Sequence, residues 1–408
     1  MFIYQIRYQK LSGIKAYNIM PSTLKGTETG ISIYDNPGQI LEQKKGGYMN
    51  CIGVLGGTGE IGSRILRILK EDYPLIASYH TRDRKSHGDC EYIHVDISDS
   101  QQVKMFCQKC DVVINCAGAS YLNGENIARI AADLRVPYID PSGEAFLEEK
   151  LDDIKDKNIF VLSSGYFPGM SGLLMRHICE SFDTPETICG LSVSDEVPSQ
   201  SAIEDFILTN LSGFGVALSY YNNGIIERDE NERLEKIRGK DYRFQNYLTV
   251  ETERVAKKYS LKKANWFNSS FGDEIIQKLQ TAIIQYKSGK DTYKNILQDV
   301  IGIFCRNTKD HEQFSYTKIE GQGVIGNNRV MMTSEISSNC SSEISAIIAA
   351  YAAKTALSSH LKNDIYYAMD IIKMDELMAD MPRLNVDLNI DNIIIERGIY
   401  DEYEEGEL

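Results

Sequence analysis

The sequence predicts an α/β protein, and three observations carry that prediction. The short apolar run Cys51–Leu55 has the composition of a buried parallel strand. The glycine-rich run Gly56–Gly62 follows it directly, and Ser63–Lys70 then carries apolar residues at helical spacing. A strand, a glycine turn and a helix in this order are typical of the start of a dinucleotide-binding Rossmann domain.

The glycine run has a physical role in such a site. One glycine makes the tight turn, one lets the backbone approach a pyrophosphate, and one lets the helix pack on the strand. The N-terminus of the helix offers unpaired N–H groups and a positive dipole end to the phosphates. The residues expected to contact the cofactor here are Gly56, Gly57, Thr58, Gly59, Glu60, Ile61 and Gly62.

The second strand, Leu75–Tyr79, helps to choose the cofactor. An acidic residue at its end would hold the ribose of NAD, but this chain continues with His80, Thr81, Arg82 and Arg84. Arginine pairs with a ribose 2′-phosphate, so the segment favours NADPH over NADH. A solvated basic turn is the alternative interpretation.

The third and fourth strands supply further candidates. Asp96 and Ile97 follow the third strand, where Asp96 either binds the adenine amino group or caps a helix that begins near Ser98. The fourth strand is Asp111–Asn115, and ligands of such sheets lie beyond the carboxyl ends of the strands. Asn115, Cys116, Ala117, Gly118 and Tyr121 are therefore expected to line the cofactor cleft.

The remaining elements follow the same alternation. We expect a helix at Asn126–Leu134, a strand at Pro137–Asp140, a strand at Ile159–Gly165 and a helix at Ser171–Ser181. Beyond them the pattern predicts strands at Thr187–Ser194, Phe314–Glu320 and Arg329–Ser334, the last two joined by a glycine-rich loop, and helices at Ser201–Leu211 and Ile344–Leu357. Residues 227–263 are dense in charge, which usually means solvated faces.

Four segments resemble the saccharopine dehydrogenase-like NAD(P)-dependent reductases. They are Leu55–Gly62, Asp111–Gly118, Tyr138–Glu144 and Gly165–Gly172, and the last two in combination are the more particular. The resemblance covers about residues 51–175, and the segment from about Leu191 to Glu312 matches no motif. It implies a Rossmann domain, an inserted α/β substrate and dimerisation domain with a mixed or antiparallel sheet, and a helix that returns to the Rossmann domain. It also implies reduction of an imine formed between an amine and a carbonyl compound, or the reverse reaction.

These observations predict five segments. Residues 1–48 form an extension ahead of Met49, 49–180 the Rossmann domain, and 181–334 the substrate and dimerisation domain. Residues 335–381 form the returning helices, and 382–408 an acidic tail that we expect to be disordered at its end. The resemblance also makes a homodimer the expected assembly.

Composition limits the possible partners. The chain has 408 residues and a formal net charge of −14, which argues against nucleic acid as a partner. It has no apolar run of membrane-spanning length, its N-terminus lacks the apolar core expected of a signal peptide, and its nine cysteines fit free thiols in a reducing cytoplasm. Cys107 and Cys110 have zinc-like spacing, but a second ligand pair is missing, so we expect no metal.

Hydride transfer to an imine also needs a proton donor near the nicotinamide. Asp140, Glu144 and Tyr166 are the candidates, because each follows a strand end. Each also has a plainer role: Asp140 as a helix cap, Glu144 as a first-turn charge, and Tyr166 as a wall of the pocket. Pro168 and Gly169 are expected to bring the backbone near the cofactor. Further along, Asp195, Ser199 and Ser201 are candidates for facing the substrate.

Three functions are compatible with these features. The first is an NADPH-dependent reductase that makes or breaks a secondary amine of a small, possibly amino-acid-like molecule. The second is a trans-acting enoyl or imine reductase that works on a carrier-bound biosynthetic intermediate, which a hydrophobic substrate pocket would favour. The third is a non-catalytic NADP-binding sensor or scaffold.

Overall fold

The structure is a computed structural model of the chain. It describes residues 50–81, 90–209, 215–269, 313–384 and 388–396, together with the short pieces 277–278, 281, 284, 288 and 298–303. The chain divides into two compact units, Met1–Gly47 and Tyr48–Leu408, and every described residue belongs to the second. The predicted extension at residues 1–48 therefore lies outside the described residues.

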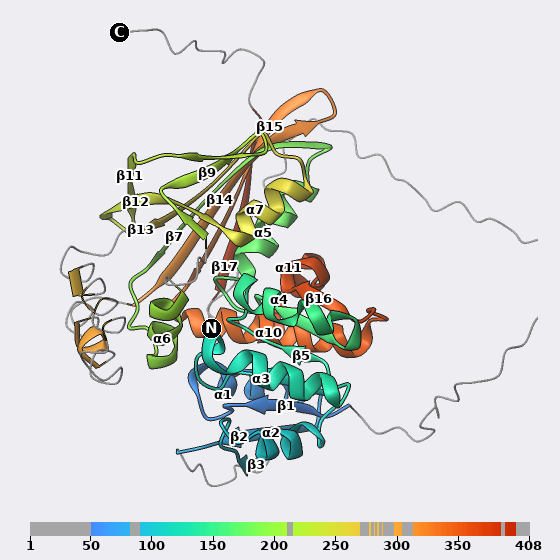
Figure 1. The fold of residues 1–408 in the computed structure, drawn as a ribbon. Coiled ribbons are helices and arrows are strands. Elements are labelled where there is room, and N and C mark those ends of the chain that lie inside the picture. Colours follow the sequence, from blue (N-terminus) through green and yellow to red (C-terminus); the bar gives the residue numbers. More distant parts are fainter. Residues whose placement is uncertain are drawn as a thin grey trace, which may run out of the picture. The chain divides into compact units, whose positions relative to one another are not determined.

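A seven-stranded parallel sheet forms the first layer, in the order β16-β6-β5-β4-β1-β2-β3 (Figure 1). Its strands are β1 Ile52–Leu55, β2 Leu75–Tyr79, β3 Glu91–His94, β4 Val112–Asn115, β5 Tyr138–Ile139, β6 Ile159–Leu162 and β16 Asp364–Tyr367. β1 and β4 are buried along their whole length, as expected of central strands that helices cover on both faces. The strand order reverses between β1 and β4, so their carboxyl ends form the switch point at which such sheets bind ligands.

Helices cover both faces of this sheet. On one face lie α2 Ser100–Cys107, α3 Ser120–Asp133 and α4 Ala145–Leu151, which is followed by the 3-10 turn η1 Asp152–Lys157. On the other face lie α1 Glu60–Leu69, α5 Met170–Glu180 and the long alanine-rich helix α10 Ser341–Ser358. α10 packs on α1 and β4, as the resemblance implied for the returning helix.

A second, mixed sheet forms the other layer, with the strand path β10-β9-β13-β7-β14-β15-β17. Its strands are β7 Thr184–Ser194, β8 Gly215–Ala217, β9 Ser219–Asn222, β10 Ile225–Arg228, β11 Glu232–Ile237, β12 Lys240–Thr249, β13 Lys263–Ser269, β14 Ser315–Ile325, β15 Asn328–Ser338 and β17 Leu388–Glu396. β7 and β13 are parallel, and the other pairs are antiparallel. The predicted fold class, a Rossmann domain plus an α/β domain with a mixed sheet, is confirmed.

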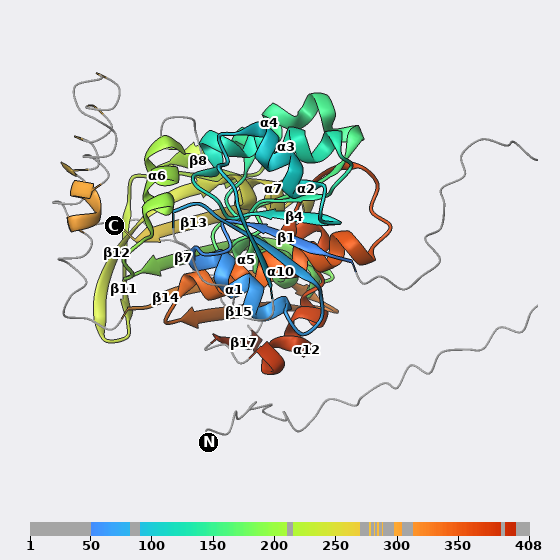
Figure 2. The same ribbon diagram turned by 90° about the horizontal axis from the view of Figure 1, so that it is seen from below.

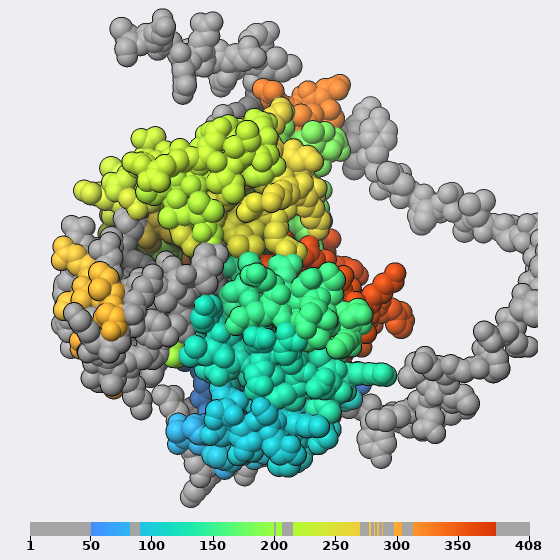
Figure 3. Space-filling model, in the orientation of Figure 1, coloured from blue at the N-terminus to red at the C-terminus, as the bar shows by residue number. Residues whose placement is uncertain are grey.

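Helices α5 and α7 Val250–Lys258 connect the two layers (Figures 1 and 2). α5 leaves the Rossmann domain, packs on β7 and β14, and contacts both α7 and the short helix α11 Ala368–Ile371. α6 Gln200–Thr209 contacts α3, and α12 Met374–Leu384 packs on α5. At the surface, atoms near residue 250 (yellow) adjoin atoms near residue 150 (green) in Figure 3.

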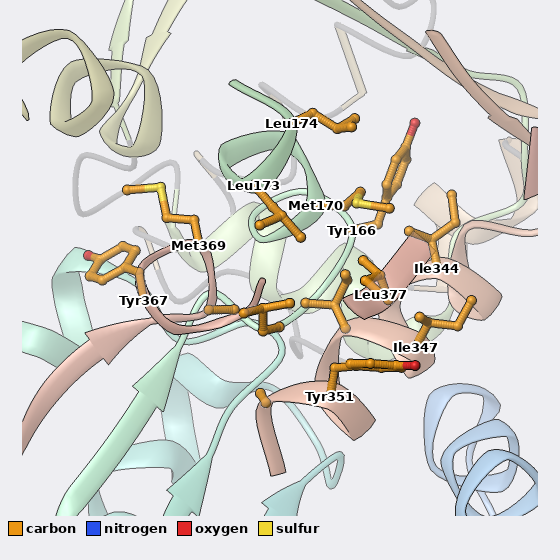
Figure 4. Packing of buried hydrophobic residues seen from close by; sticks show 14 of the residues in the cluster. Tyr166, Met170, Leu173, Leu174, Ile344, Ile347, Tyr351, Tyr367, Met369 and Leu377 are labelled. Carbon is orange, nitrogen blue, oxygen red and sulfur yellow. The ribbon is translucent and has the colours of Figure 1, made fainter. Parts of the chain in front are cut away.

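One continuous apolar core joins the layers. Figure 4 shows Tyr166, Met170 and Leu173 beside Ile344 and Ile347, so side chains from the end of the Rossmann sheet, from α5 and from α10 pack together. All five are buried, and most are completely so. Because these elements share a core, the position of the second sheet depends on packing against the Rossmann domain.

Several predicted boundaries were wrong. The helix predicted at Asn126–Leu134 begins at Ser120, directly after the fourth strand. The glycine-rich loop predicted after Glu320 is mostly strand, because Gly321 lies in β14 under Ile178 of α5, where a Cβ would come 2.3 Å from the Ile178 Cγ2. Strand β16, which completes the Rossmann sheet, was not predicted.

The predicted acidic tail at residues 382–408 also contains regular structure. α12 continues to Leu384, and β17 pairs with β15 from Leu388 to Glu396. The run 393–395 consists of three isoleucines, which is typical of a strand. Residues 397–408, which include the end expected to be disordered, lie outside the described residues.

Candidate functional site

The glycine run forms a tight turn between β1 and α1. Gly56 has a φ of 74°, its N–H donates to the Ser78 Oγ at 2.8 Å, and its carbonyl accepts from the Gly59 N–H at 2.9 Å. A Cβ at Gly62 would lie 2.3 Å from the Gly56 carbonyl oxygen. The sequence therefore needs glycine at both ends of this turn to bring α1 against β1.

The N-terminus of α1 has no side-chain cap. Gly59 is its N-cap residue and offers no side-chain oxygen, while Thr58 and Gly59 are both partly exposed. Ile61 points into the core, and the exposed Glu60 accepts a hydrogen bond from the Ser342 Oγ at 3.1 Å. The first-turn N–H groups therefore have the geometry of a phosphate-binding cradle.

The carboxyl ends of β2 and β3 lie beside this turn. His80 and Thr81 are exposed, and the rings of His80 and His94 lie 5.7 Å apart. Arg82 and Arg84, on which the prediction of NADPH rests, lie outside the described residues. No acidic side chain stands at the end of β2 within residues 75–81.

Asp96 does not cap the following helix. Its Oδ1 accepts from the N–H and the Oγ of Ser98, at 2.9 and 2.7 Å, whereas Asp99 is the N-cap of α2. The hydrogen bonds from Ser98 lower the pKa of Asp96. Ile97 approaches the loop after β4, since its Cδ1 would lie 3.3 Å from a Cβ on Gly118.

The loop after β4 lies at the switch point of the sheet, against the glycine turn. Asn115 is buried, and its amide donates to the Tyr138 hydroxyl at 2.9 Å while its Oδ1 accepts from the Ala117 N–H at 3.2 Å. The Cys116 carbonyl lies so close to Gly56 that a Cβ there would be 2.4 Å from its oxygen. The loops after β1 and β4 are therefore in contact, with Cys116 and Ala117 partly exposed at the edge.

Asp140 has a structural role in this arrangement. It is 0% exposed, and its Oδ2 accepts from the Ser120 Oγ at 2.6 Å and from the Tyr138 hydroxyl at 2.5 Å. Its Oδ1 accepts from the N–H groups of Ser142 and Gly143 at 2.9 and 2.8 Å. With both oxygens engaged, Asp140 anchors the loop after β5, which argues against proton transfer. It does not cap α4, whose N-cap residue is Glu144.

Tyr166 also has its hydroxyl engaged. Its oxygen lies 2.6 Å from the Thr317 Oγ1 on β14, and its N–H donates to the Ser345 Oγ at 3.1 Å. Burial raises the pKa of the phenol above its usual range. Tyr166 therefore joins the Rossmann loop to the second sheet, and this contact leaves proton transfer by Tyr166 without geometric support.

Glu144 is different from the other two candidates. It is 2% exposed, and Arg254, the cation that interacts with it, already binds Glu148 through two contacts of 3.1 Å. Burial raises the pKa of Glu144 well above its usual range, and the neighbouring carboxyl of Glu251 adds to the increase. Burial and the neighbouring carboxyl therefore both favour the protonated form of Glu144.

Glu251 binds the loop between β6 and α5. It lies on α7, is 1% exposed, and accepts from the Gly169 N–H at 2.9 Å and from the Ser171 Oγ at 2.5 Å. These groups belong to the N-terminus of α5, which follows the cis peptide bond before Pro168. The loop expected to bring backbone near the cofactor is thus fixed by a carboxylate of the second domain.

A second carboxylate makes a similar contact. Asp205 on α6 accepts from the Tyr121 N–H at 3.3 Å, at the N-terminus of α3, where Ala119 provides no side-chain cap. Burial raises the pKa of Asp205 to about 7. Tyr121, which we expected to contact the cofactor, therefore has its backbone occupied by the second domain, while its ring packs on Phe146 at 5.2 Å.

Sequence reasoning missed Glu251 and Asp205. Glu251 lies in the charged segment 227–263, which we expected to be solvated, and that expectation is wrong at this position. The available signal was its place in the first turn after Thr249, a residue that caps α7 with its side chain. No sequence pattern indicated a role for Asp205, because its contact with Tyr121 depends on the packing of α6 against α3.

Other candidates make contacts within the second domain. Asp195 binds the Lys240 Nζ at 3.0 Å and the Tyr242 hydroxyl at 3.2 Å, and Ser199 accepts from the Ala202 N–H near the start of α6. The Ser201 Oγ lies 3.3 Å from that of Ser199. The arginines of the charged segment pair with acidic side chains or lie on a ring: Arg228 with Glu230, Arg233 with Glu235, Arg243 with Glu232, Arg254 with Glu148, and Arg238 over Phe314.

Cys107 and Cys110 are buried in the core between α2 and the sheet. Burial raises the pKa of Cys107 to about 12, so its thiol stays protonated. Within the described part of the chain, no three His, Cys, Asp or Glu side chains are grouped so that they could hold a metal ion. Of the helices that the structure describes, none combines the length and apolar composition needed to span a bilayer.

The fold and the glycine turn define a Rossmann-type nucleotide-binding protein, and comparisons with known proteins agree. Residues 52–136, about a fifth of the chain, match the model of the NAD dependent epimerase/dehydratase family. This stretch contains the glycine turn and the loops after β2, β3 and β4, and the match indicates a nicotinamide dinucleotide as the cofactor. A comparison with curated proteins gave no match.

Among solved structures, the apo form of saccharopine dehydrogenase (L-Glu forming) from Saccharomyces cerevisiae superposes with a TM-score of 0.58. It is 12% identical, and the match covers 84% of this chain and 100% of that one. Uronate dehydrogenase from Agrobacterium tumefaciens is 17% identical, with a TM-score of 0.22 over 24% of this chain and 42% of that one. WbmH from Bordetella bronchiseptica is 16% identical, with a TM-score of 0.24 over 35% and 67%. The predicted resemblance to saccharopine dehydrogenase is thus confirmed for the fold.

Proposed function

We propose that this chain is an NAD(P)H-dependent oxidoreductase that reduces an imine formed between an amine and a carbonyl compound, or oxidises a secondary amine in reverse. The observation that carries the proposal is the uncapped N-terminus of α1 behind the Gly56–Gly62 turn, at the switch point of the sheet. The second sheet and its helices lie over the same loops, which supports a substrate site between the two layers.

The residues present fit a nicotinamide dinucleotide. Gly56 and Gly62 leave room where any Cβ would clash, and the first turn of α1 offers N–H groups to a pyrophosphate. The proposal includes a preference for NADPH, supported by the arginines at positions 82 and 84 and by the missing acid at the end of β2. A carboxylate there would repel a 2′-phosphate.

The chain must supply a proton for this reaction. When bound, the reduced nicotinamide supplies a hydride, which adds to the imine carbon as the carbon–nitrogen π bond breaks. The nitrogen gains one proton, which we assign to the Glu144 carboxyl; the resulting carboxylate recovers its proton from solvent. Glu144 suits this role because burial favours its protonated form, and Arg254, the cation that interacts with it, already binds Glu148.

Titration and turnover together test the proposal. Trp266 is the single tryptophan of the chain, and its ring lies against Phe167 in the loop after β6, so its emission reports binding at the site. We expect NADPH to quench Trp266, Arg82→Ala to weaken NADPH more than NADH, and NADPH oxidation to require an amine and a carbonyl compound together. Absence of binding by either nucleotide would remove the proposal.

Glu144→Gln separates chemistry from binding. We expect kcat to fall by about a hundred-fold, the scale of general acid catalysis, with the Kd for NADPH unchanged. Glu149→Gln on the exposed side of α4 is the matched control and should leave kcat at the wild-type value. Equal kcat values for the two variants would rule out Glu144 as the proton donor. Tight NADPH binding without turnover on any amine and carbonyl pair would favour the sensor.

One observation favours the second candidate function, reduction of a carrier-bound enoyl or imine intermediate. Phe167 exposes an aromatic face in the loop after β6, and every arginine of the charged segment is paired or stacked elsewhere. Turnover of an enoyl thioester without an amine would establish it. The leading proposal instead includes an amino-acid-like substrate and a homodimer, which substrate screening and sedimentation equilibrium would test.

A further inference from the structure

Phe167 is unusual among the residues of its loop. Gly165, Tyr166 and Gly169 are buried, whereas Phe167 is 39% exposed. Leaving so much of a large aromatic ring in water gives up part of the stabilisation that burial would supply. Part of Phe167 is therefore accessible to a ligand.

The ring of Phe167 is fixed by the second domain. Its centroid lies 5.1 Å from that of Trp266 on β13, with 14° between the planes. Trp266 is itself 0% exposed, and its indole N–H donates to the Asn268 Oδ1 at 2.9 Å. Gly190 on β7 makes room behind the indole, because a Cβ there would lie 2.2 Å from the Trp266 Cε3. One face of the Phe167 ring thus rests on a buried support, while the residue as a whole is 39% exposed.

The loop that carries Phe167 lies next to the proposed proton donor. A Cβ on Gly165 would lie 2.7 Å from the carbonyl oxygen of Pro141, so the loops after β5 and β6 are in contact. The loop after β5 ends in Glu144, and Glu251 interacts with Glu144 and binds Gly169. Phe167 therefore lies in a loop at the carboxyl edge of the sheet, and this loop contacts the one that ends in Glu144.

The position also separates Phe167 from the nucleotide-binding turn. In the sheet, β6 is two strands from β4 and three from β1. At about 4.8 Å for each strand, the loop after β6 is roughly 10 Å from the loop after β4. That distance, together with the stack on Trp266, assigns Phe167 to the substrate side of the site.

We propose that the exposed face of Phe167, supported by Trp266, binds a planar apolar substituent, such as an aromatic ring, next to the reacting carbon of the substrate. This inference rests on the proposed function and names its substrate class. Parallel stacking on an aromatic face favours a planar group over a puckered one of equal size. The residues described in the loops after β5 and β6 include no lysine or arginine, so this side of the site does not favour a carboxylate.

Two amines of equal charge and similar size test the proposal by binding alone. Protein labelled with 15N-tryptophan gives one indole N–H signal, from Trp266. Benzylamine should shift this signal saturably and bind about two- to ten-fold more tightly than cyclohexylmethylamine, the ratio expected of one stacking contact. Phe167→Ala should abolish that preference, and Phe167→Leu, which keeps apolar bulk but no plane, should also remove it.

The controls keep the outcomes distinct. Met105→Ala, an exposed apolar position on α2, should leave both affinities unchanged. Equal binding of the two amines, absence of a saturable shift, or an unchanged preference in Phe167→Leu would each overturn the proposal. The measurement needs no turnover. Selective binding of benzylamine without NADPH oxidation would therefore support stacking on Phe167 and reject the proposed reductase function.

Discussion

Replacement of Glu251 by glutamine should change how the stability of this protein depends on pH. Glu251 is 1% exposed on α7 and accepts hydrogen bonds from Gly169 and Ser171. Burial raises its pKa to about 7, although these hydrogen bonds oppose the increase. Glutamine keeps one oxygen for the Gly169 N–H, and its amide can donate to the Ser171 Oγ, so Glu251→Gln removes the titration while retaining both contacts.

The sign and size follow from linkage. A carboxyl whose pKa is higher in the folded than in the unfolded chain stabilises the fold at acid pH, and that stabilisation is lost as pH rises through about 7. The ordinary pKa of 4.5 applies to Glu251 in the unfolded chain. As pH rises from about 6 to about 8.5, the ionisation of Glu251 therefore reduces the free energy of unfolding by about 1.4 kcal/mol. Over the same pH interval, the free energy of unfolding of Glu251→Gln should fall by about 1.4 kcal/mol less than that of the wild type.

Urea denaturation followed by Trp266 emission at both pH values measures the difference. The quantity compared is the change in the free energy of unfolding with pH. The contributions of other titrating groups cancel between wild type and variant as long as the substitution does not affect them. Glu149→Gln, exposed on α4, should retain the wild-type slope. If Glu251→Gln shows the same loss of stability with pH as the wild type, Glu251 is ionised throughout, and our account of the α5 N-terminus is wrong.

Three further outcomes are expected. Gly62→Ala should weaken NADPH binding at least ten-fold in a Trp266 titration, because its Cβ would lie 2.3 Å from the Gly56 oxygen and push α1 away from the turn; wild-type affinity would contradict this. Thr317→Val should cost about 1 to 3 kcal/mol in urea denaturation by leaving the Tyr166 hydroxyl buried and unpaired, whereas Thr317→Ser should cost less. Asp205→Asn should likewise flatten the fall in stability between about pH 5 and pH 8, since burial raises the Asp205 pKa to about 7; a slope equal to that of the wild type would show that Asp205 is already charged.

Local patterns in the sequence were sufficient for most of the Rossmann half of the fold, with strand β16 as the exception. Short apolar runs locate the buried strands β1, β2 and β4, because a strand covered on both faces has no polar alternation. Gly59 and Gly62 are explained by contacts with the Gly56 carbonyl in the same turn, whereas Gly56 and Gly57 make room for Cys116 after β4 and Ala77 in β2. The second sheet was harder, because its glycines make space for side chains far away in sequence, as Gly190 does for Trp266.

The candidate site was predictable only in part for the same reason. Asp140, Glu144 and Tyr166 all follow strand ends, so the sequence alone does not distinguish them as candidate proton donors. The structure distinguishes them by their partners: Asp140 binds five donors in its own domain, Tyr166 pairs with Thr317, and Glu144 interacts with Glu251 and Arg254. Two of these three distinctions depend on the second domain, whose contacts no local pattern records.

The second domain holds the Rossmann domain through carboxylates placed at helix N-termini. Asp205 accepts from the first turn of α3, Glu251 from the start of α5, and Glu196 from the N–H of Ser341 at the start of α10, at 2.9 Å. None of these three helices has a side-chain cap of its own, so each relies on the other domain for an acceptor. Helices α1 and α4 of the Rossmann domain also lack a side-chain cap, and among the described residues no carboxylate of the second domain accepts from their first-turn N–H groups. Of these two open N-termini, only that of α1 follows the glycine turn, which supports the proposed phosphate site there.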